Sequence, residues 1–206
     1  MTRGRLITIE GIDGAGKSTL ASALVSALED RGIDVTLLRE PGGVHAAERI
    51  RALVKDPAAT IGARAEALLY AAARAQLVEE ALEPLLAGGE LVLLDRFVDS
   101  SLAYQGAGRR LGVAAVRAIN DFGTGGLTPD RTLLLTLDPP LGRSRSHTRG
   151  APPDRLESQP DDFFDRIAAA YADLARSEPE RVKPIDASTD PADVLAQALT
   201  AIADLL

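Results

Sequence analysis

Near the start of the chain, residues 11–18 have the types and the spacing of a phosphate-binding loop. Their sequence, GIDGAGKS, matches the pattern G-x-x-x-x-G-K-[ST] at every fixed position. Glycines allow the backbone to curl so that successive N–H groups point at one phosphate, next to a helix N-terminus that favours anions. Lys17 can bridge the β- and γ-phosphates, and the Ser18 hydroxyl can ligate Mg²⁺. The motif predicts a nucleoside triphosphate site, and a Gly-rich turn that merely joins a strand to a helix is the alternative.

An acidic residue further along the chain can complete the predicted metal site. Asp95 follows the apolar run Leu91–Leu94. An acid at the end of a buried strand lies at the carboxyl edge of a parallel sheet, where ligands bind. There Asp95 can hold Mg²⁺ directly or through water. A strand-terminal aspartate can also be only a helix cap, but a phosphate-binding loop elsewhere in the chain favours the metal.

Three arginines lie where they could hold an anionic acceptor. Arg39 follows the second predicted strand, Arg51 lies on the helix after it, and Arg96 adjoins the acidic residue Asp95. A guanidinium group can hold a phosphate through two parallel hydrogen bonds. Each arginine alone could form only a solvated salt bridge, but three at ligand-facing positions indicate a second phosphate in the site.

Tyr70 and Arg74 lie one helical turn apart, so they share a face of their predicted helix. The chain has only three tyrosines. An aromatic residue at this spacing can equally belong to the core. The arginine beside it, on a helix otherwise rich in Ala and Leu, favours a ligand-facing role.

The elements that must position these residues alternate along the chain. Continuous apolar runs of four to six residues, typical of strands covered on both faces, alternate with segments of helical period, which indicates a parallel sheet. The predicted strands are Leu6–Ile9, Val35–Leu38, Leu91–Leu94, Thr132–Leu137 and Val182–Ile185. The predicted helices cover residues 17–31, 44–55, 62–87, 98–106, 112–122, 140–148, 161–176 and 191–205.

Residues 149–160 do not fit this alternation. Their sequence, RGAPPDRLESQP, is rich in Gly, Pro and charged residues. Such a segment can be a linker or a mobile flap that covers phosphates, and its composition alone leaves both interpretations open.

The bulk composition narrows the class of protein. The 206 residues suffice for one α/β domain and carry a net charge of −7, which argues against a nucleic-acid-binding protein. With no cysteine, disulfides and thiolate chemistry are excluded. The apolar run that begins at Leu6 is far too short for a signal-peptide core or a membrane span. These features predict a soluble cytoplasmic protein that binds no membrane.

Other motifs separate the classes of protein that use a phosphate-binding loop. The sequence has no N-K-x-D, which GTPases use to read guanine, and it is too short for the partner domains of ABC-type ATPases. The remaining small class is the nucleoside monophosphate kinases. Within it, the chain resembles the bacterial thymidylate kinases along nearly its whole length, through the motifs EGIDGAGKS (10–18), REPGG (39–43), DRF (95–97), SSLAYQG (100–106) and the flap residues RG (149–150) and DR (154–155).

The resemblance implies a fold, an activity and an assembly. The fold would be the three-layer P-loop NTPase fold: a five-stranded parallel sheet of order 2-3-1-4-5, helices on both faces and a short lid at about residues 145–160. The chain, residues 1–206, would form one domain. The activity would be that of a dTMP kinase, which phosphorylates dTMP to dTDP with ATP and Mg²⁺, a step in dTTP synthesis. The partners would be ATP and dTMP, and the enzyme would be a homodimer.

The resemblance also implies roles around the acceptor nucleotide. It assigns Arg39, Arg51 and Arg96 to the monophosphate, stacks Tyr70 on thymine and directs a hydrogen bond from Arg74 to O4 of the base. The complete implied dTMP site is Asp13, Arg39, Glu40, Pro41, Arg51, Tyr70, Arg74, Arg96, Ser101, Tyr104 and Gln105.

Within this site, the family pattern gives four residues more specific tasks. Ser101 and Gln105 would face the edge of the base. Tyr104 would crowd the sugar 2′ position and so disfavour a ribonucleotide. Asp13 would contact the 3′-hydroxyl region and the metal network.

The implied ATP site contains the phosphate-binding loop and residues of the lid: Gly11, Ile12, Asp13, Gly14, Ala15, Gly16, Lys17, Ser18, Thr19, Arg145 and Arg149. The metal ligands would be Ser18 and Asp95, and the catalytic residues would be Lys17, Arg96, Arg149 and Asp13.

Thymidylate kinases supply a catalytic arginine either from the phosphate-binding loop or from the lid. The loop here has no arginine, whereas the lid region has Arg145, Arg149 and Arg155, so the chain is similar to the second kind. Arg149 is the predicted transition-state arginine, and Arg145 and Arg155 would assist it or stack near adenine. A kinase for another small acceptor and a non-catalytic nucleotide-binding module stay open as alternatives.

Overall fold

The computed structural model describes residues 3–147 and 154–206, so the predicted catalytic residue Arg149 lies outside the described residues. Five parallel strands form one sheet: β1 (Arg5–Gly11), β2 (Val35–Arg39), β3 (Leu91–Asp95), β4 (Arg131–Thr136) and β5 (Val182–Asp186). Their order is β2-β3-β1-β4-β5. Both the parallel sheet and this order confirm the prediction.

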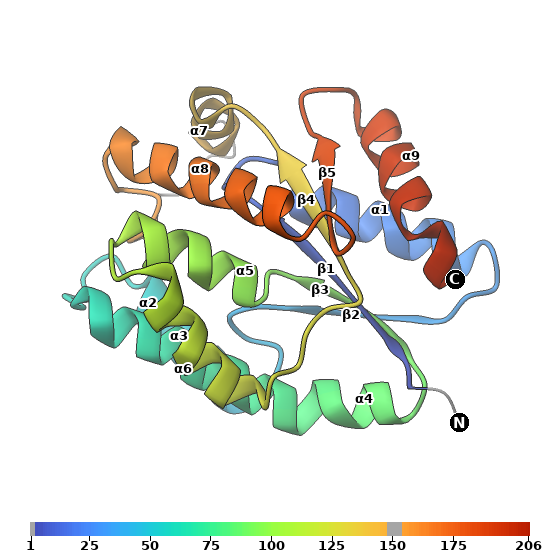
Figure 1. The fold of residues 1–206 in the computed structure, drawn as a ribbon, viewed down its shortest axis with the longest axis horizontal. Helices are drawn as coiled ribbons and strands as arrows, with labels where there is room; N and C mark the ends of the chain where they lie inside the picture. Colours follow the sequence, from blue (N-terminus) through green and yellow to red (C-terminus); the bar gives the residue numbers. More distant parts are fainter. Residues whose placement is uncertain (1–2, 148–153) are drawn as a thin grey trace.

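Helices cover both faces of the sheet (Figure 1). On one side lie α1 (Lys17–Glu29) and α9 (Pro191–Ile202), which pack against each other. The helices of the other side are α2 (His45–Lys55), α3 (Ala63–Leu77), α4 (Glu83–Ala87), α5 (Val98–Ser101), α6 (Val113–Thr124) and α8 (Asp161–Ser177). Helix α7 (Pro139–His147) follows β4 and contacts α8.

The core consists of the sheet and the apolar faces of these helices. Leu6, Ile7 and Ile9 of β1 and Leu93 and Leu94 of β3 are fully buried, as continuous apolar strands of a covered sheet should be. Complete burial of one such side chain contributes about 1.5–3 kcal/mol. Aliphatic side chains make up most of the core, and the buried aromatic residues Phe97, Phe163 and Phe164 complete it.

Two predicted helices contain π-helical turns. The segment predicted as one helix, residues 62–87, is α3, then the π turn Val78–Leu82, then α4. Pro84, at the start of α4, lacks the N–H that a regular α-helix requires and crowds the preceding turn, so a local change of helical geometry precedes it. The predicted helix at 98–106 is α5 followed by the π turn Leu102–Gly108, and the 3₁₀ turn Ala203–Leu205 extends α9.

The register of the sheet brings three strand ends together. Arg39 of β2 and Ile9 of β1 are both direct neighbours of Asp95 on β3. The loop after β1, the end of β2 and the end of β3 therefore meet at one edge of the sheet. Among the described residues, no helix is long and apolar enough to cross a membrane.

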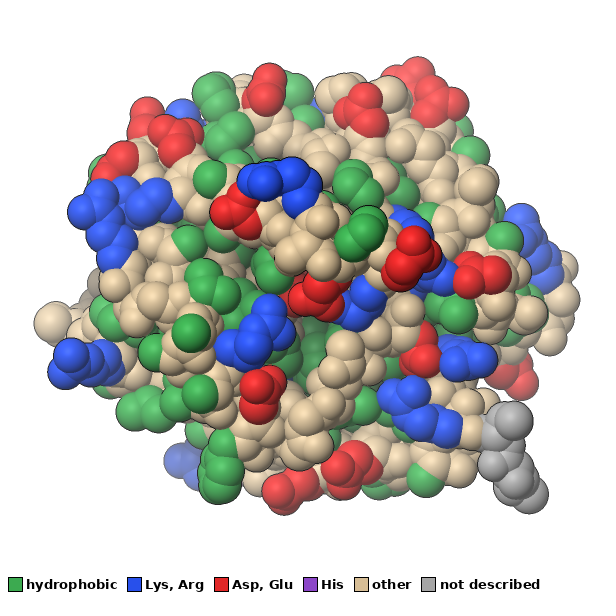
Figure 2. All heavy atoms as spheres, in the orientation of Figure 1, with side chains coloured by type: hydrophobic (Ala, Val, Ile, Leu, Met, Phe, Trp, Pro, Cys, Tyr) green, Lys and Arg blue, Asp and Glu red, His purple; other side chains and the backbone are tan. Residues whose placement is uncertain are grey.

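Surface charges are mixed on the face that Figure 2 shows. Acidic and basic side chains are interspersed there, without a continuous basic stripe of the kind that nucleic-acid-binding proteins use.

Candidate active site

A cavity of about 700 Å³ lies at this edge of the sheet. Its lining combines residues from the loop after β1, the ends of β2 and β3, helix α3, the segment 100–105 and the start of α9. Among the predicted site residues, the lining includes Asp13, Gly14, Ala15, Gly16, Lys17, Ser18, Thr19, Arg39, Glu40, Pro41, Arg51, Tyr70, Asp95, Arg96, Ser101, Tyr104, Gln105 and Arg145. Gly11 and Ile12 contribute backbone to the loop without lining the cavity.

The phosphate-binding loop has the conformation that its glycines allow. Gly14 has a φ of +82°, and a Cβ atom at this position would lie 2.0 Å from the carbonyl oxygen of Gly142 on α7. No side chain other than hydrogen fits there. Gly16 is left-handed, with φ 93° and ψ 18°, and immediately precedes the first turn of α1. The loop therefore leads directly into α1. Its backbone N–H groups and the N-terminus of the helix lie together, and anions bind favourably there.

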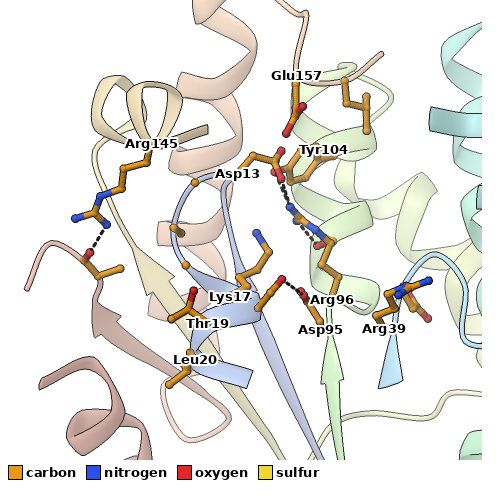
Figure 3. A pocket seen from close by; sticks show the side chains of 18 of the residues that line it. Asp13, Lys17, Thr19, Leu20, Arg39, Asp95, Arg96, Tyr104, Arg145 and Glu157 are labelled. Atoms are coloured by element: carbon orange, nitrogen blue, oxygen red, sulfur yellow. Dashed lines mark hydrogen bonds and ion pairs between the residues drawn. The ribbon is translucent and has the colours of Figure 1, made fainter. Parts of the chain in front are cut away.

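Lys17 lies at the centre of the loop (Figure 3) and is buried. Its Nζ donates hydrogen bonds to the carbonyl oxygens of Ile12 at 2.9 Å and Gly11 at 3.1 Å. Burial lowers the pKa of Lys17 to about 8, together with the nearby Arg96 guanidinium, while Asp13 opposes the shift. The ammonium group is thus held at the loop by backbone carbonyl oxygens, which phosphate oxygens can replace.

Ser18 and Asp95 form the candidate metal site. Ser18 Oγ donates a hydrogen bond to Asp95 Oδ2 at 3.1 Å, while Asp95 Oδ1 is buried without a hydrogen-bond partner among the described residues. A hard oxygen ligand that is buried and unpartnered fits Mg²⁺, which takes one or two protein oxygens and completes its shell with phosphates and water. The described residues contain no cluster of three His, Cys, Asp or Glu side chains that could hold a metal ion.

Arg96 connects the phosphate-binding loop to the segment after β3. Its Nη2 donates to Asp13 Oδ1 at 2.5 Å and to the Tyr104 hydroxyl at 3.3 Å, and its Nη1 donates to Ser100 Oγ at 3.1 Å and to the Gly11 carbonyl at 3.2 Å. Tyr104 in turn donates to Asp13 Oδ2 at 3.0 Å. Arg96 has a φ of 71°, a strained conformation for a non-glycine residue that is typical of functional sites.

The same contacts fix the charge of Asp13. Burial alone would raise the pKa of this carboxyl group, but Arg96 and Lys17 outweigh burial and lower it to about 2. Asp13 is therefore ionised at neutral pH and holds the Arg96 guanidinium at the mouth of the loop.

Glu10 was not predicted as a site residue, although it directly precedes the loop. Its buried carboxylate accepts hydrogen bonds from the backbone N–H groups of Phe97 at 2.7 Å and Ser100 at 3.2 Å. It also accepts from the hydroxyls of Ser100 at 2.6 Å and Tyr171 at 2.8 Å. Burial, together with Asp99, raises its pKa. Glu10 thereby fixes the turn that carries Arg96, and nothing in the sequence pattern indicates that this acid is buried.

Arg39 and Arg51 extend the positive charge along the cavity. Arg51 Nη1 donates to the carbonyl oxygen of Pro41 at 2.7 Å, and Arg39 Nη2 donates to Glu48 Oε1 at 3.0 Å. Burial and the nearby Arg39 lower the pKa of Arg51, the response expected of cations held close together. Both side chains line the cavity, as Arg96 does.

Arg74 does not line the cavity, in contrast to Tyr70, Ser101 and Gln105. Its guanidinium is 2% exposed and forms hydrogen bonds with four groups: Glu40 Oε2 (2.8 Å from Nε), Ser101 Oγ (2.9 Å), the Phe97 carbonyl (2.9 Å) and the Asn120 side chain. It therefore lies behind Ser101, and its predicted hydrogen bond to a base stays a prediction. Asn120 was not predicted, because nothing in the sequence connects α6 with α3.

The two lid arginines that the structure describes, Arg145 and Arg155, have different surroundings. Arg145 Nη1 donates to the Ala187 carbonyl at 2.8 Å, and both residues line the cavity. Figure 3 shows Arg145 and Arg39 on opposite sides of the phosphate-binding loop. Arg155 does not line the cavity. It lies on the α2–α3 side, where it donates to the Val54 carbonyl at 3.0 Å and to Glu66 at 2.6 Å. Its predicted role, to assist Arg149 or to stack near adenine, stays a prediction.

Several lining residues had no signal in the sequence. They come from the lid, from the segment after β5 and from α9: Leu156, Glu157, Ala187, Thr189, Pro191 and Val194. Their residue types are common on protein surfaces and in cores. Only their position, in the lid or after the last strand, distinguishes them.

Comparisons with known proteins agree with this geometry. The family model described as thymidylate kinase matches residues 9–198. A thymidylate kinase of Deinococcus radiodurans is 47% identical over 204 residues, which cover 99% of this chain and 98% of the relative. One of Lactobacillus delbrueckii subsp. bulgaricus is 46% identical over 200 residues, or 96% of this chain and 94% of the relative. The crystal structure of thymidylate kinase from Ehrlichia chaffeensis superposes with a TM-score of 0.80 at 27% identity and covers 98% of this chain and 99% of that one.

Proposed function

The chain belongs to the thymidylate kinase family, and we infer from this that it phosphorylates dTMP to dTDP with ATP as the phosphoryl donor. It is therefore a phosphotransferase that acts in the synthesis of dTTP. One structural observation best supports this function. A single cavity contains the phosphate-binding loop and, next to it, a second region with three arginines, a tyrosine and a glutamine. Such a cavity can hold a donor and an acceptor nucleotide with their phosphates facing each other.

We propose that ATP occupies the side of the cavity near α9 and Arg145, with its β- and γ-phosphates on the loop. Lys17 would exchange its hydrogen bonds to the loop carbonyls for bonds to phosphate oxygens. The acceptor phosphate would lie between Arg39, Arg51 and Arg96. It needs no general base, because a phosphate monoester is largely ionised at pH 7, with its second pKa near 6. The chain's contribution to the reaction is then the alignment of two phosphates and the neutralisation of their charge.

Asp13, Tyr104 and the base-facing residues would select the nucleoside. The hydrogen-bonded group of Asp13, Arg96 and Tyr104 presents polar atoms at the position proposed for the sugar. Tyr70, Ser101 and Gln105 line the part of the cavity proposed for thymine.

Mg²⁺ is the proposed metal, and Ser18 and Asp95 are its proposed protein ligands. The buried, unpartnered Asp95 Oδ1 supports this assignment. When bound, Mg²⁺ neutralises charge on the β- and γ-phosphates. Without metal, the serine and aspartate only hydrogen-bond each other.

We also propose a cytoplasmic homodimer. The helices α2, α3 and α6 pack side by side and carry three exposed apolar side chains, Leu53 at 46%, Leu68 at 57% and Phe122 at 91%. Large apolar side chains exposed on adjacent helices are typical of a subunit interface. Light scattering after gel filtration would test the assembly. A mass of one chain at micromolar concentration would contradict it, and Phe122→Asp should convert the dimer to a monomer.

The function is tested by ADP release from ATP and Mg²⁺ with dTMP, dUMP, UMP, CMP, AMP and GMP offered separately. We expect fast turnover with dTMP, slower turnover with dUMP and little with the others. Faster turnover with another acceptor would retain the kinase and reject the base assignments. ATP binding without acceptor-dependent ADP release would identify a nucleotide-binding module instead.

A further inference from the structure

Glu66 is a buried carboxylate just behind the part of the cavity proposed for the base. It lies in the first turn of α3 and is 0% exposed. Its Oε1 accepts a hydrogen bond from Gln105 Nε2 at 2.8 Å. Arg109 Nη2 donates to Oε2 at 3.0 Å, and Arg155 Nη1 donates to the same oxygen at 2.6 Å. Two guanidinium groups and a helix N-terminus thus surround the Glu66 carboxylate.

The charge of Glu66 determines which way the amide of Gln105 faces. An ionised carboxylate can only accept hydrogen bonds, so the NH₂ end of Gln105 must face Glu66. The carbonyl oxygen, Oε1, is on the other branch of the same planar amide. Gln105 lines the cavity, and no residue that the structure describes donates a hydrogen bond to its Oε1. The atom that Gln105 offers to a ligand is therefore an acceptor.

Ser101, one turn before Gln105, has the opposite polarity. Arg74 Nη1 donates to Ser101 Oγ at 2.9 Å, and a guanidinium group cannot accept. The serine oxygen is occupied as an acceptor from that side, so its hydroxyl hydrogen is available to a ligand. The cavity then presents a donor at Ser101 and an acceptor at Gln105. A pyrimidine with a C4 carbonyl and an N3–H group complements this pair. A pyrimidine with a 4-amino group and an unprotonated N3 has both polarities reversed.

We propose that Glu66 is a positioning residue that fixes the Gln105 amide with its oxygen toward the base, and so selects 4-oxo over 4-amino pyrimidine nucleotides. The inference rests on the proposed function, because it takes the acceptor to be a pyrimidine nucleotide bound in this cavity. A site built to hydrogen-bond a substrate rejects an analogue that leaves its buried polar groups unpaired by about 10⁴–10⁵-fold. Loss of one fixed amide should remove a substantial part of that discrimination.

The test measures the dissociation constants of dTMP and dCMP by calorimetry for the wild-type protein, Glu66→Gln and the matched control Glu79→Gln. A glutamine at 66 can donate or accept, so the amide at 105 can turn over. We expect the preference for dTMP over dCMP to fall at least tenfold in Glu66→Gln and to stay unchanged in Glu79→Gln, whose glutamate is exposed on the turn after α3. An equal loss of affinity for both nucleotides, with the preference intact, would overturn the inference and leave Glu66 a purely structural residue.

Gln105→Glu provides a second test, which does not depend on the folding of the first variant. A carboxyl group at 105 must take up a proton to face the carboxylate of Glu66, as two adjacent carboxylates do. The dissociation constant of dTMP should then rise with pH above neutrality in this variant relative to wild type. A pH dependence identical to that of wild type would also overturn the inference.

These experiments separate the inference from the proposed function. Wild-type protein that binds and phosphorylates dTMP, together with an unchanged preference in Glu66→Gln, rejects only the role of Glu66. Wild-type protein that does not bind dTMP rejects the proposed function itself.

Discussion

Ser18 Oγ and Asp95 Oδ2 are joined by a hydrogen bond of 3.1 Å, although 77 positions separate them in the chain. The pairing of β1 with β3 brings them together, since Ile9 and Asp95 are direct neighbours in the sheet. Asp95 retains one buried oxygen without a partner among the described residues, and a buried acceptor left unpaired costs about 1–3 kcal/mol. A cation at this position would remove that cost.

Asp95→Asn should therefore weaken the response to Mg²⁺. We expect the Mg²⁺ concentration for half-maximal activity to rise at least tenfold, because an amide oxygen is neutral and its NH₂ group repels a cation. The measurement is the initial rate against free Mg²⁺ at fixed ATP, with chelator added to establish the zero point. Asp34→Asn, at an exposed aspartate before β2, is the control. An unchanged Mg²⁺ dependence in Asp95→Asn would assign the metal to other ligands.

Lys17 should give opposite pH trends in activity and stability. Its pKa, lowered to about 8 by burial, predicts that kcat/KM for ATP falls with increasing pH above about 8, as the free enzyme loses this charge. Phosphates favour the charged form, so the fall in kcat should occur at higher pH. The unfolded chain, with a lysine pKa of 10.5, binds more protons than the folded chain between these values. The free energy of unfolding should therefore rise with pH there, by up to about 1 kcal/mol per unit.

The measurements for this prediction are pH–rate profiles and urea denaturation of the protein without nucleotide between pH 8 and 9.5. Lys17→Met is the reference, because it removes the titrating group. A difference in stability between wild type and Lys17→Met that does not vary with pH would contradict the prediction.

The buried pair of Arg74 and Glu40 should be important for stability. Arg74→Met leaves the Glu40 carboxylate without its cation, which typically costs about 3–5 kcal/mol. Burial raises the pKa of Glu40 to about 7 even though Arg74 opposes the shift, so the loss of Arg74 should raise it further. When folding raises the pKa of a carboxyl group, the free energy of unfolding falls as pH increases above the pKa that the group has in the unfolded chain, here 4.5. The loss in Arg74→Met should thus be smaller at pH 5 than at pH 8.

Urea denaturation at both pH values tests this prediction. Adding Glu40→Gln to Arg74→Met should recover part of the loss at pH 8, because no charge then remains buried. The control is Arg176→Met, which breaks the exposed pair with Asp173 and should change the free energy of unfolding by less than about 1 kcal/mol. A loss that is equal at pH 5 and pH 8 would show that packing, rather than the charge of Glu40, dominates.

Local patterns were sufficient to predict most of the fold. Most strands contain a run of apolar residues and each long helix has an apolar face, so both could be predicted from neighbouring residues. The loop at 11–18 was equally local, because all its functional atoms come from one short segment. The sheet order came from the family resemblance, since no pattern within a strand specifies its neighbour.

Such patterns could not predict which polar and charged residues are buried. Glu10, Glu66 and Asn120 receive hydrogen bonds from residues 39 to 161 positions away, and their types alone suggest exposure rather than burial. Arg74 was predicted to contact the base, whereas its donors are directed to protein groups around Ser101. Only the three-dimensional arrangement reveals which polar residues support the site from behind and which ones line it.

The lid arginines should separate into a catalytic residue and a binding residue. Arg149, predicted from the sequence to stabilise the transferring phosphoryl group, should when changed to alanine lower kcat by about 10³-fold or more, as expected for an arginine of this type, with little change in the dissociation constants of ATP and dTMP. Arg145 lines the cavity beside Ala187, so Arg145→Ala should mainly raise the KM for ATP. Single-turnover rates and calorimetry on both variants test this division. An unchanged kcat in Arg149→Ala would transfer the catalytic role to Arg145 or Arg155. Arg155 contacts Val54 and Glu66 on the acceptor side, and these contacts would have to break before Arg155 could reach the phosphates.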